Sequence, residues 1–344
     1  MKTKKIISLF LSTLLVLSLA GCGNTSAGAA KGEAVSGSLV LYTSEPEELV
    51  SELIAAFNRE YPDVAIELFR SGTGKVTAKM DAELATGSTM ANLIWFADIG
   101  YMKNLDEQGM LVHYKAPNAA GIDPSYIYGD GFGTEVRLIY NVIAYNTAEV
   151  AAAPADWQDV TKEEYRGSFA IADPNYSGGS FTALVTHVQY PDAVGWKWYE
   201  DIMANECRFE QSNGALMTKV SSGEYKAAEI VDFQIRAAKA EGSPVDLVYP
   251  ASGAVLVPTP LCIMNNVPED SLEAAKAFVN WCLSDTAQEM LAAQQYIPVG
   301  NVAGPEGAPK ASEIRVLPFD LDYFTRESAG IRETYTERFG GTEG

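Results

Sequence analysis

The stretch "SLVLYTSEPEELVSELIAAFNREYPDVAIELF", residues 38–69, holds two strand patterns with a helix pattern between them. Each strand pattern is short and apolar, and the second alternates apolar and polar residues from Val64 to Leu68. Between them, apolar residues recur at helical spacing: Leu49, Leu53, Ile54 and Phe57. Ser44 and Glu47 form a capping-box pattern that predicts the start of this helix. The stretch therefore predicts a βαβ unit, the repeating element of an α/β sheet.

The rest of the chain continues this alternation of strands and helices, which favours mostly parallel sheets with helices on both faces. One helix is predicted over residues 271–292. Two stretches without helical period, 135–147 and 249–266, read as antiparallel crossings between two lobes. The expected parts are lobe 1 over 38–137, lobe 2 with its hinge crossings over 138–257, and a return to lobe 1 with C-terminal helices over 258–344. The length also favours two lobes, because about 300 residues are too many to pack around a single hydrophobic core.

The N-terminus has the features of an export signal. Three lysines precede an apolar run over residues 6–19, which is shorter than a membrane-spanning helix needs. The following "LAGC" resembles the lipobox of bacterial lipoproteins, which implies cleavage of residues 1–21 and lipidation of Cys22. Residues 22–37 are rich in Gly, Ser and Ala and predict a flexible tether. We therefore expect an exported protein that is lipid-anchored through Cys22 at the outer face of the cell membrane.

Net charge and cysteine spacing limit the partners and the metal or disulfide sites that the sequence allows. The formal charge is −20, and loss of three lysines with the signal would take it to −23, which argues against nucleic acid as a partner. Cys207, Cys262 and Cys282 lie at no metal-binding spacing and allow at most one disulfide. We expect them to be small buried residues, with Cys262 in a strand and Cys282 in a helix.

The loop "FRSGTGK", residues 69–75, resembles a phosphate-binding loop but departs from the nucleotide pattern at Phe69 and at the residue after Lys75. It still joins a strand to a helix through two glycines, so backbone N–H groups and the helix dipole would face an anion. The candidate donors are Ser71, Gly72, Thr73 and Gly74. The alternative is an ordinary turn without a ligand.

A second loop repeats this pattern in the other predicted lobe. In "NYSGGSFTALV", residues 175–185, a Ser-Gly-Gly-Ser run directly precedes an amphipathic helix. Its candidate donors are Ser177, Gly178, Gly179 and Ser180. Two such loops, one from each lobe, would close on one anion, although each alone fits ordinary N-capping by serine.

Other candidates lie near the ends of predicted strands or at the hinge. Arg137 would clamp a phosphate or carboxylate, or else pair with Glu135 on the surface. Asp98 and Asp232 follow predicted strands, where open α/β sheets bind ligands, although both also suit a cap or turn. The set is completed by Thr43, Ser44 and Asn213. Neither histidine belongs to a metal or Ser–His pattern, and we expect no catalysis and no cofactor.

Five motifs occur in one order: "LVLYTSEPEELVSELIAAFNREYP", "FRSGTGKVTAKMDAELATG", "LIWFAD", "DPNYSGGSF" and "EAAKAFVNWCLSDTAQ". In this order they resemble the extracellular solute-binding proteins of ABC importers, in the group with ferric-iron, phosphonate and sugar-phosphate binders. The resemblance implies a type II periplasmic-binding-protein-like fold, with two α/β lobes joined by a two-crossing hinge. It also implies a monomer that captures a small solute and delivers it to ABC permease subunits.

The sequence departs from the ferric-iron members of that group. They carry an adjacent tyrosine pair where this chain has Val231-Asp232-Phe233, and this chain has Ser44-Glu45-Pro46 where a His or Tyr is common. The serine–glycine loop that holds an anion in ferric binders remains at 177–180. We therefore expect a small anionic solute that carries a phosphate or phosphonate group. A ferric or other metal binder, an exported enzyme and an adhesin remain alternatives.

Overall fold

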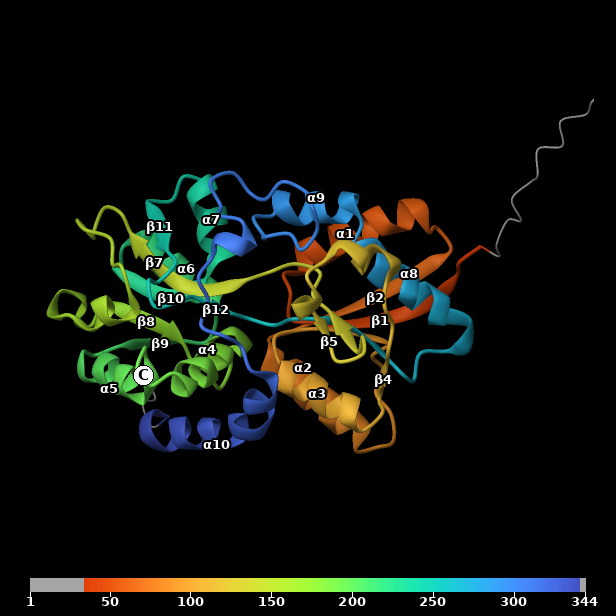
Figure 1. Cartoon of the computed structure of the whole chain (residues 1–344), viewed down its shortest axis with the longest axis horizontal. Coiled ribbons are helices and arrows are strands. Elements are labelled where there is room, and N and C mark those ends of the chain that lie inside the picture. The colour runs from red at the N-terminus through yellow and green to blue at the C-terminus, as the bar shows by residue number, and fades with distance from the viewer. Residues whose placement is uncertain (1–33, 341–344) are drawn as a thin grey trace, which may run out of the picture. The chain divides into compact units, whose positions relative to one another are not determined.

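The computed structural model describes residues 34–340, which form two β-sheets, each with helices on both faces (Figure 1). The first sheet has the order β2-β1-β3-β13-β6-β5, and β4 pairs with β13. Its strands are β1 (Gly37–Thr43), β2 (Val64–Arg70), β3 (Leu93–Trp95), β4 (Leu111–Val112), β5 (Ile127–Tyr128), β6 (Gly133–Thr134) and β13 (Leu261–Met264). Its helices are α1 (Glu47–Glu60), α2 (Thr73–Leu84), α3 (Ile99–Glu107), α8 (Leu272–Cys282) and α9 (Asp285–Ala293). This sheet with its helices is called lobe 1.

Lobe 2 is built on the second sheet, which has the order β11-β7-β10-β8-β9, with β12 paired to β7. Its strands are β7 (Tyr140–Asn146), β8 (Phe169–Ala172), β9 (Arg208–Glu210), β10 (Ala227–Val231), β11 (Val245–Val248) and β12 (Val255–Leu256). Its helices are α4 (Gly178–Gln189), α5 (Gly195–Ala204), α6 (Asn213–Ser222) and α7 (Asp232–Ala240). Short 3₁₀ helices span Pro117–Gly121, Pro124–Tyr126, Trp157–Thr161, Glu163–Tyr165, Glu269–Ser271 and Ala311–Glu313. The predicted α/β fold class is confirmed.

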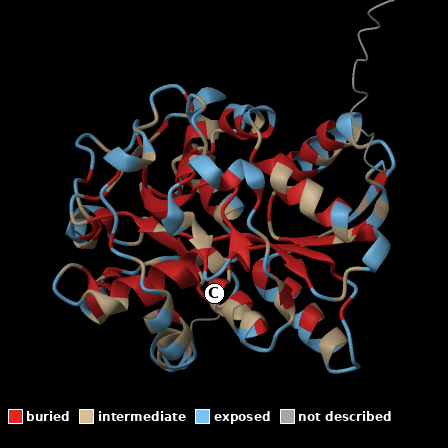
Figure 2. Cartoon of the chain, turned by 45° about the vertical axis from the view of Figure 1, so that its right-hand side comes forward, coloured by how far each residue is buried: buried red, intermediate tan, exposed pale blue. Residues whose placement is uncertain are grey.

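Strand β1 lies inside its sheet between β2 and β3, parallel to both, and is buried from both faces. Leu39 and Leu41 belong to the core under α1 and α8, whereas Tyr42 packs in the core with residues of α2 and α3. A strand that is covered on both faces needs apolar residues at successive positions, which explains the run in the sequence. Figure 2 shows the buried strands inside and the exposed residues on the outer helix faces and loops.

Three local predictions were wrong. Helix α1 begins at Glu47 after Pro46, without a side-chain cap, so Ser44 and Glu47 form no capping box. The helix predicted over 271–292 is two helices, because Ser284 is extended and its hydroxyl caps α9 by accepting from the N–H of Ala287 at 3.3 Å. The sheets are mixed rather than mostly parallel, because the strands that follow the crossings, β7 and β13, run antiparallel to neighbouring strands.

Within residues 34–340, three segments pass between the lobes. Two are the expected crossings, from β6 to β7 and from β12 to β13. The third follows α9, and the N–H of Leu138 on the first crossing donates to the carbonyl of Ile297 on the third at 2.8 Å. This third segment leads to α10 (Leu321–Phe339), which packs against α3 of lobe 1 and α4 of lobe 2. The C-terminal helix therefore contacts both lobes.

The cysteines that the structure describes are free. Cys262 lies in β13 and Cys282 in α8, and both are buried, as predicted, whereas Cys207 is partly buried. No helix within 34–340 is long and apolar enough to cross a membrane. The predicted signal segment, the lipidation site Cys22 and most of the tether lie outside the described residues.

Candidate functional site

A cavity of about 340 Å³ lies between the lobes, at the carboxyl ends of strands from both sheets. It is called the central cavity here. Its wall includes the first residues of five helices or the residues just before them: α1, α2, α4, α6 and α7. Each helix N-terminus carries free N–H groups and the positive end of a dipole. The fold therefore directs five positive helix ends toward one small volume.

Seven of the predicted site residues line the central cavity: Ser44, Gly72, Thr73, Ser177, Gly178, Gly179 and Asn213. The two glycine-containing loops thus meet at one cavity, one from each lobe. Gly74 and Asp98 line a smaller neighbouring cavity of about 220 Å³, which we call the side cavity. Thr43, Ser71, Ser180, Arg137 and Asp232 line neither cavity.

The loop before α4 is held firmly in lobe 2. The hydroxyl of Ser177 caps α4 by accepting from the N–H of Ser180 at 3.3 Å. The carbonyl of Gly179 accepts from Nδ2 of Asn141 on β7 at 2.7 Å. Ser180 itself is buried, and its hydroxyl has no partner among the described residues.

The lobes touch each other at Gly178. A methyl group placed there would lie 2.1 Å from the carbonyl oxygen of Ala97 in lobe 1 and 2.9 Å from the hydroxyl oxygen of Thr73. Such a separation is far inside van der Waals contact, so only glycine allows this approach. The two lobes are therefore in direct contact at this position.

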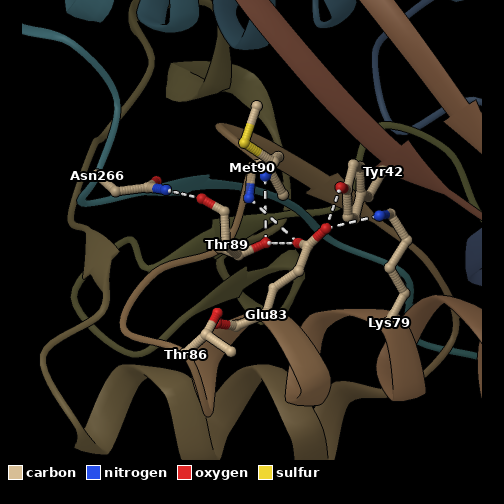
Figure 3. Close-up of polar contacts among 8 residues, drawn as sticks. Tyr42, Lys79, Glu83, Thr86, Thr89, Met90 and Asn266 are labelled. Atoms are coloured by element: carbon tan, nitrogen blue, oxygen red, sulfur yellow. Dashed lines mark hydrogen bonds and ion pairs between the residues drawn. The ribbon is translucent and has the colours of Figure 1, made fainter.

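Helix α2 is anchored at its far end by Glu83 (Figure 3). One carboxylate oxygen accepts from Lys79 at 2.6 Å and from the hydroxyl of Tyr42 on β1 at 2.9 Å. The other accepts from the hydroxyl of Thr89 at 2.7 Å and the N–H of Met90 at 3.1 Å. Burial acts to raise the pKa of Glu83, but these hydrogen bonds outweigh it and lower the pKa to about 2. The network ties α2 to the sheet and to the loop that leads into β3.

Arg137 lies inside the hinge instead of facing a ligand. Its guanidinium is fully buried, pairs with Glu45 and donates to the hydroxyl of Thr259 on the second crossing. The N–H of Thr259 in turn donates to Glu135 at 2.8 Å. Arg137 therefore links the two crossings to lobe 1, and it neutralises the one carboxylate of the central cavity, Glu45.

Asp232 also forms contacts within the protein. It is fully buried at the start of α7, pairs with Arg236 at 2.8 Å and accepts from the N–H of Tyr140 at 3.1 Å. Arg236 also donates to the carbonyl of Gln295 on the third segment, at 2.8 Å from Nη2. Asp232 thus ties lobe 2 to the hinge.

Arg70 was not among the predicted site residues, although it ends β2 directly before the glycine loop. It is exposed and lines the central cavity, where its Nε donates to the backbone carbonyl of Glu45 at 3.1 Å. It forms no ion pair with a described residue. Asn213 is also in the wall, and its Oδ1 is buried without a hydrogen-bond partner among the residues that the structure describes. Arg70 and Asn213 therefore line the same cavity.

Metal-binding side chains do not gather in the part of the chain that the structure describes. No group of three or more His, Cys, Asp or Glu side chains there is placed to hold a metal ion. Tyr176 lines the cavity without a second tyrosine beside it. The donor set of the cavity is made of N–H groups, hydroxyls, amides and one arginine, which suits an anion with several oxygens.

Residues 52–313 match the family model for bacterial extracellular solute-binding proteins. The chain belongs to this family.

Solved structures show the same fold for this solute-binding protein. AfuA from Actinobacillus pleuropneumoniae, with fructose-6-phosphate bound, matches 89% of this chain and 100% of its own at a TM-score of 0.79 and 21% identity. Iron-bound HitA from Pseudomonas aeruginosa matches 86% and 98% at a TM-score of 0.73 and 18% identity. At these identities the likeness concerns the fold alone.

Curated relatives are similarly distant. The spermidine/putrescine-binding periplasmic protein 1 of Haemophilus influenzae is 24% identical over 328 residues, which cover 89% of this chain and 88% of the relative. A putative 2-aminoethylphosphonate-binding periplasmic protein of Salmonella typhimurium is 23% identical over 199 residues, 55% and 56% of the two chains. Their names cover cationic and anionic solutes, so the choice of solute depends on this protein's own cavity.

Proposed function

We propose that this solute-binding protein serves an ABC importer by capturing a small organic anion with a phosphate or phosphonate group and delivering it to the permease. The observation that supports this most is the convergence of five helix N-termini and the unpaired Arg70 on the central cavity. Phosphate oxygens accept hydrogen bonds from such N–H groups and from arginine. Gly72, Thr73, Ser177, Gly178, Gly179 and Asn213 would supply the other donors.

A cationic solute fits this cavity less well. A polyamine needs free carboxylates, whereas the cavity's carboxylate, Glu45, is already paired with the buried Arg137. Arg70 and the positive helix ends would repel an ammonium group. A ferric ion needs several anionic ligands, and the described residues offer no such cluster.

Closure would couple binding to delivery. A ligand that touches donors of both lobes stabilises the closed form through the contacts that exist only there. Gly72 and Thr73 belong to lobe 1, and Ser177 to Gly179 belong to lobe 2. We further propose that Cys22 carries a lipid that holds the protein at the outer face of the membrane, beside the permease.

Isothermal titration of the mature protein with inorganic phosphate, 2-aminoethylphosphonate, fructose 6-phosphate and spermidine tests this function. We expect a phosphate- or phosphonate-bearing compound to bind and spermidine not to bind. Arg70→Gln should weaken binding roughly tenfold through loss of a charge-assisted hydrogen bond. Arg59→Gln, which changes an exposed arginine in the last turn of α1, should leave affinity unchanged. Spermidine binding alone, or a visible tyrosinate band with Fe³⁺ and carbonate, would contradict the proposal.

A further inference from the structure

The side cavity adjoins the central cavity, and the two share four wall residues: Thr73, Tyr176, Ser177 and Gly178. Its volume of about 220 Å³ is enclosed by three parts of the chain. Lobe 1 contributes the first turn of α2 and Asp98, lobe 2 contributes residues 174–178, and the C-terminal helix α10 contributes Arg332. A ligand that extends from the central cavity into this space would contact both lobes and α10.

Arg332 is held in a fixed position without an ion pair. Its guanidinium carbon lies 3.5 Å from the ring centroid of Phe181, and its Nη1 donates to the carbonyl of Pro174 at 3.0 Å. Its Nε and Nη2 donate to no described acceptor. Stacking on an aromatic ring fixes the plane of a guanidinium, so the free donors point in set directions. Burial lowers the pKa of Arg332, and the nearby Asp98 and Asp173 partly offset this effect.

Asp98 supplies the opposite charge in the same cavity. Its Oδ1 caps α3 by accepting from the N–H of Tyr101 at 3.0 Å, while Oδ2 accepts no hydrogen bond from a described residue. Asp98 and Arg332 interact electrostatically but form no ion pair. Desolvation raises the pKa of Asp98, and the Tyr101 N–H and Arg332 oppose that shift.

The rest of the wall is polar and neutral. Thr77 donates its hydroxyl to the carbonyls of Thr73 and Gly74 and keeps its lone pairs free. Asn175 accepts from Thr336 of α10 at 3.2 Å, which leaves its amide hydrogens free. The side cavity therefore offers both donors and acceptors, together with one positive and one negative charge.

We propose that the side cavity binds the hydroxyl-bearing part of the ligand, so that the solute is a polyhydroxylated organic phosphate such as a sugar or polyol phosphate. This inference rests on the proposed function of the central cavity. A carboxylate in the side cavity would be attracted by Arg332 but repelled by Asp98, and an ammonium group would be attracted by Asp98 but repelled by Arg332, so neither charge gains clearly. Neighbouring hydroxyl groups of a ligand suit both residues, because a hydroxyl donates a hydrogen bond to Asp98 and accepts one from Arg332. Asp98 and Arg332 are thus residues that determine specificity.

Titration calorimetry with fructose 6-phosphate, glycerol 3-phosphate, inorganic phosphate and 2-aminoethylphosphonate tests this inference in the wild type and three variants. Asp98→Asn keeps the cap of α3, because asparagine also caps helices. Arg332→Gln removes the charge and the stacked guanidinium. Arg338→Gln is the matched control, because Arg338 lies on the same helix as Arg332 but outside the cavity, where it stacks on Trp196 of α5.

We expect fructose 6-phosphate to bind more tightly than inorganic phosphate in the wild type. Asp98→Asn and Arg332→Gln should each weaken fructose 6-phosphate by roughly 10- to 100-fold, the range of hydrogen bonds to charged groups. Both variants should keep the affinity for inorganic phosphate within about twofold of wild type. Arg338→Gln should leave the affinity for either compound unchanged. The inference is overturned if inorganic phosphate or 2-aminoethylphosphonate binds as tightly as fructose 6-phosphate, or if both variants keep wild-type affinity. Loss of all phosphate binding in the wild type would instead overturn the proposed function itself.

Discussion

In lobe 1 Gly72 and Gly74 lie at the start of α2, and in lobe 2 Gly178 and Gly179 are the first residues of α4. A methyl group at Gly72 would meet no atom within 4 Å, whereas one at Gly178 would overlap a carbonyl of the opposite lobe. The α4 loop has a serine cap, while Gly72 gives α2 no side-chain cap. Similar sequences thus serve different purposes: the loop of lobe 1 leaves its backbone open to a ligand, and the loop of lobe 2 also forms the contact between lobes.

Two glutamates, one from each lobe, also differ in their surroundings. Glu83 in lobe 1 accepts four hydrogen bonds. Glu229 on β10 of lobe 2 is almost completely buried, and neither of its oxygens has a hydrogen-bond partner within residues 34–340. Burial raises the pKa of Glu229 to about 8. The surroundings of Glu83 therefore stabilise a charged carboxylate, while those of Glu229 favour a neutral one.

Comparing Gly178→Ala with Gly72→Ala tests the difference between these glycines. Gly178→Ala should cause the largest loss of affinity among the variants in this section. The added methyl at position 178 has to displace Ala97, so we expect the lobes to stay apart and affinity for the bound phosphate compound to fall by roughly 100-fold, about 3 kcal/mol. Gly72 has an extended backbone, φ −63° and ψ 151°, that alanine also adopts. Calorimetry with small-angle scattering measures both effects. Equal affinities for the two variants would show that Gly178 does not limit closure.

Glu229→Gln tests the difference between the glutamates through pH. Folded Glu229 keeps its proton up to about pH 8, whereas in the unfolded chain it loses the proton near its ordinary pKa of 4.5. The unfolded state therefore binds fewer protons between these values, and this group lowers the free energy of unfolding as pH rises, by up to about 1.4 kcal/mol per pH unit. Urea unfolding from pH 5 to 9 should show a shallower decline in the variant. The control is Glu289→Gln on the exposed face of α9. Parallel curves for wild type and Glu229→Gln would contradict the assignment.

The sequence revealed the parts of the fold and site that depend on local patterns. The βαβ unit and the two glycine loops could be predicted because strand alternation, helical spacing and glycine position are all readable over short stretches. The loops meet at one cavity because strands of both sheets end at the space between the lobes.

Roles that depend on distant partners could not be predicted. Arg137 lies on the first crossing, but its partners Glu45 and Thr259 come from other elements, and only the fold shows these contacts. Arg332 lies near the end of the chain, and no local pattern connects it with Asp98. Arg70 did have a local signal, since it ends a strand beside the glycine loop.

Among these variants, Glu83→Gln should cause the smallest change. The stability contribution of Glu83 should depend on pH in the opposite direction from that of Glu229. Its lowered pKa contributes stability that is fully present above pH 4.5 and is lost as pH falls toward about 2. Because Glu83 is partly solvated, we expect the variant to lose only about 1 kcal/mol near pH 7, with the gap to wild type narrowing in urea titrations toward pH 3.5. If the difference in free energy of unfolding between wild type and variant stays constant with pH, Glu83 contributes to stability through its shape and not through its charge. Affinity for phosphate should stay within about twofold, because Glu83 anchors the end of α2 that faces away from the central cavity, whereas the glycines at its other end face the ligand.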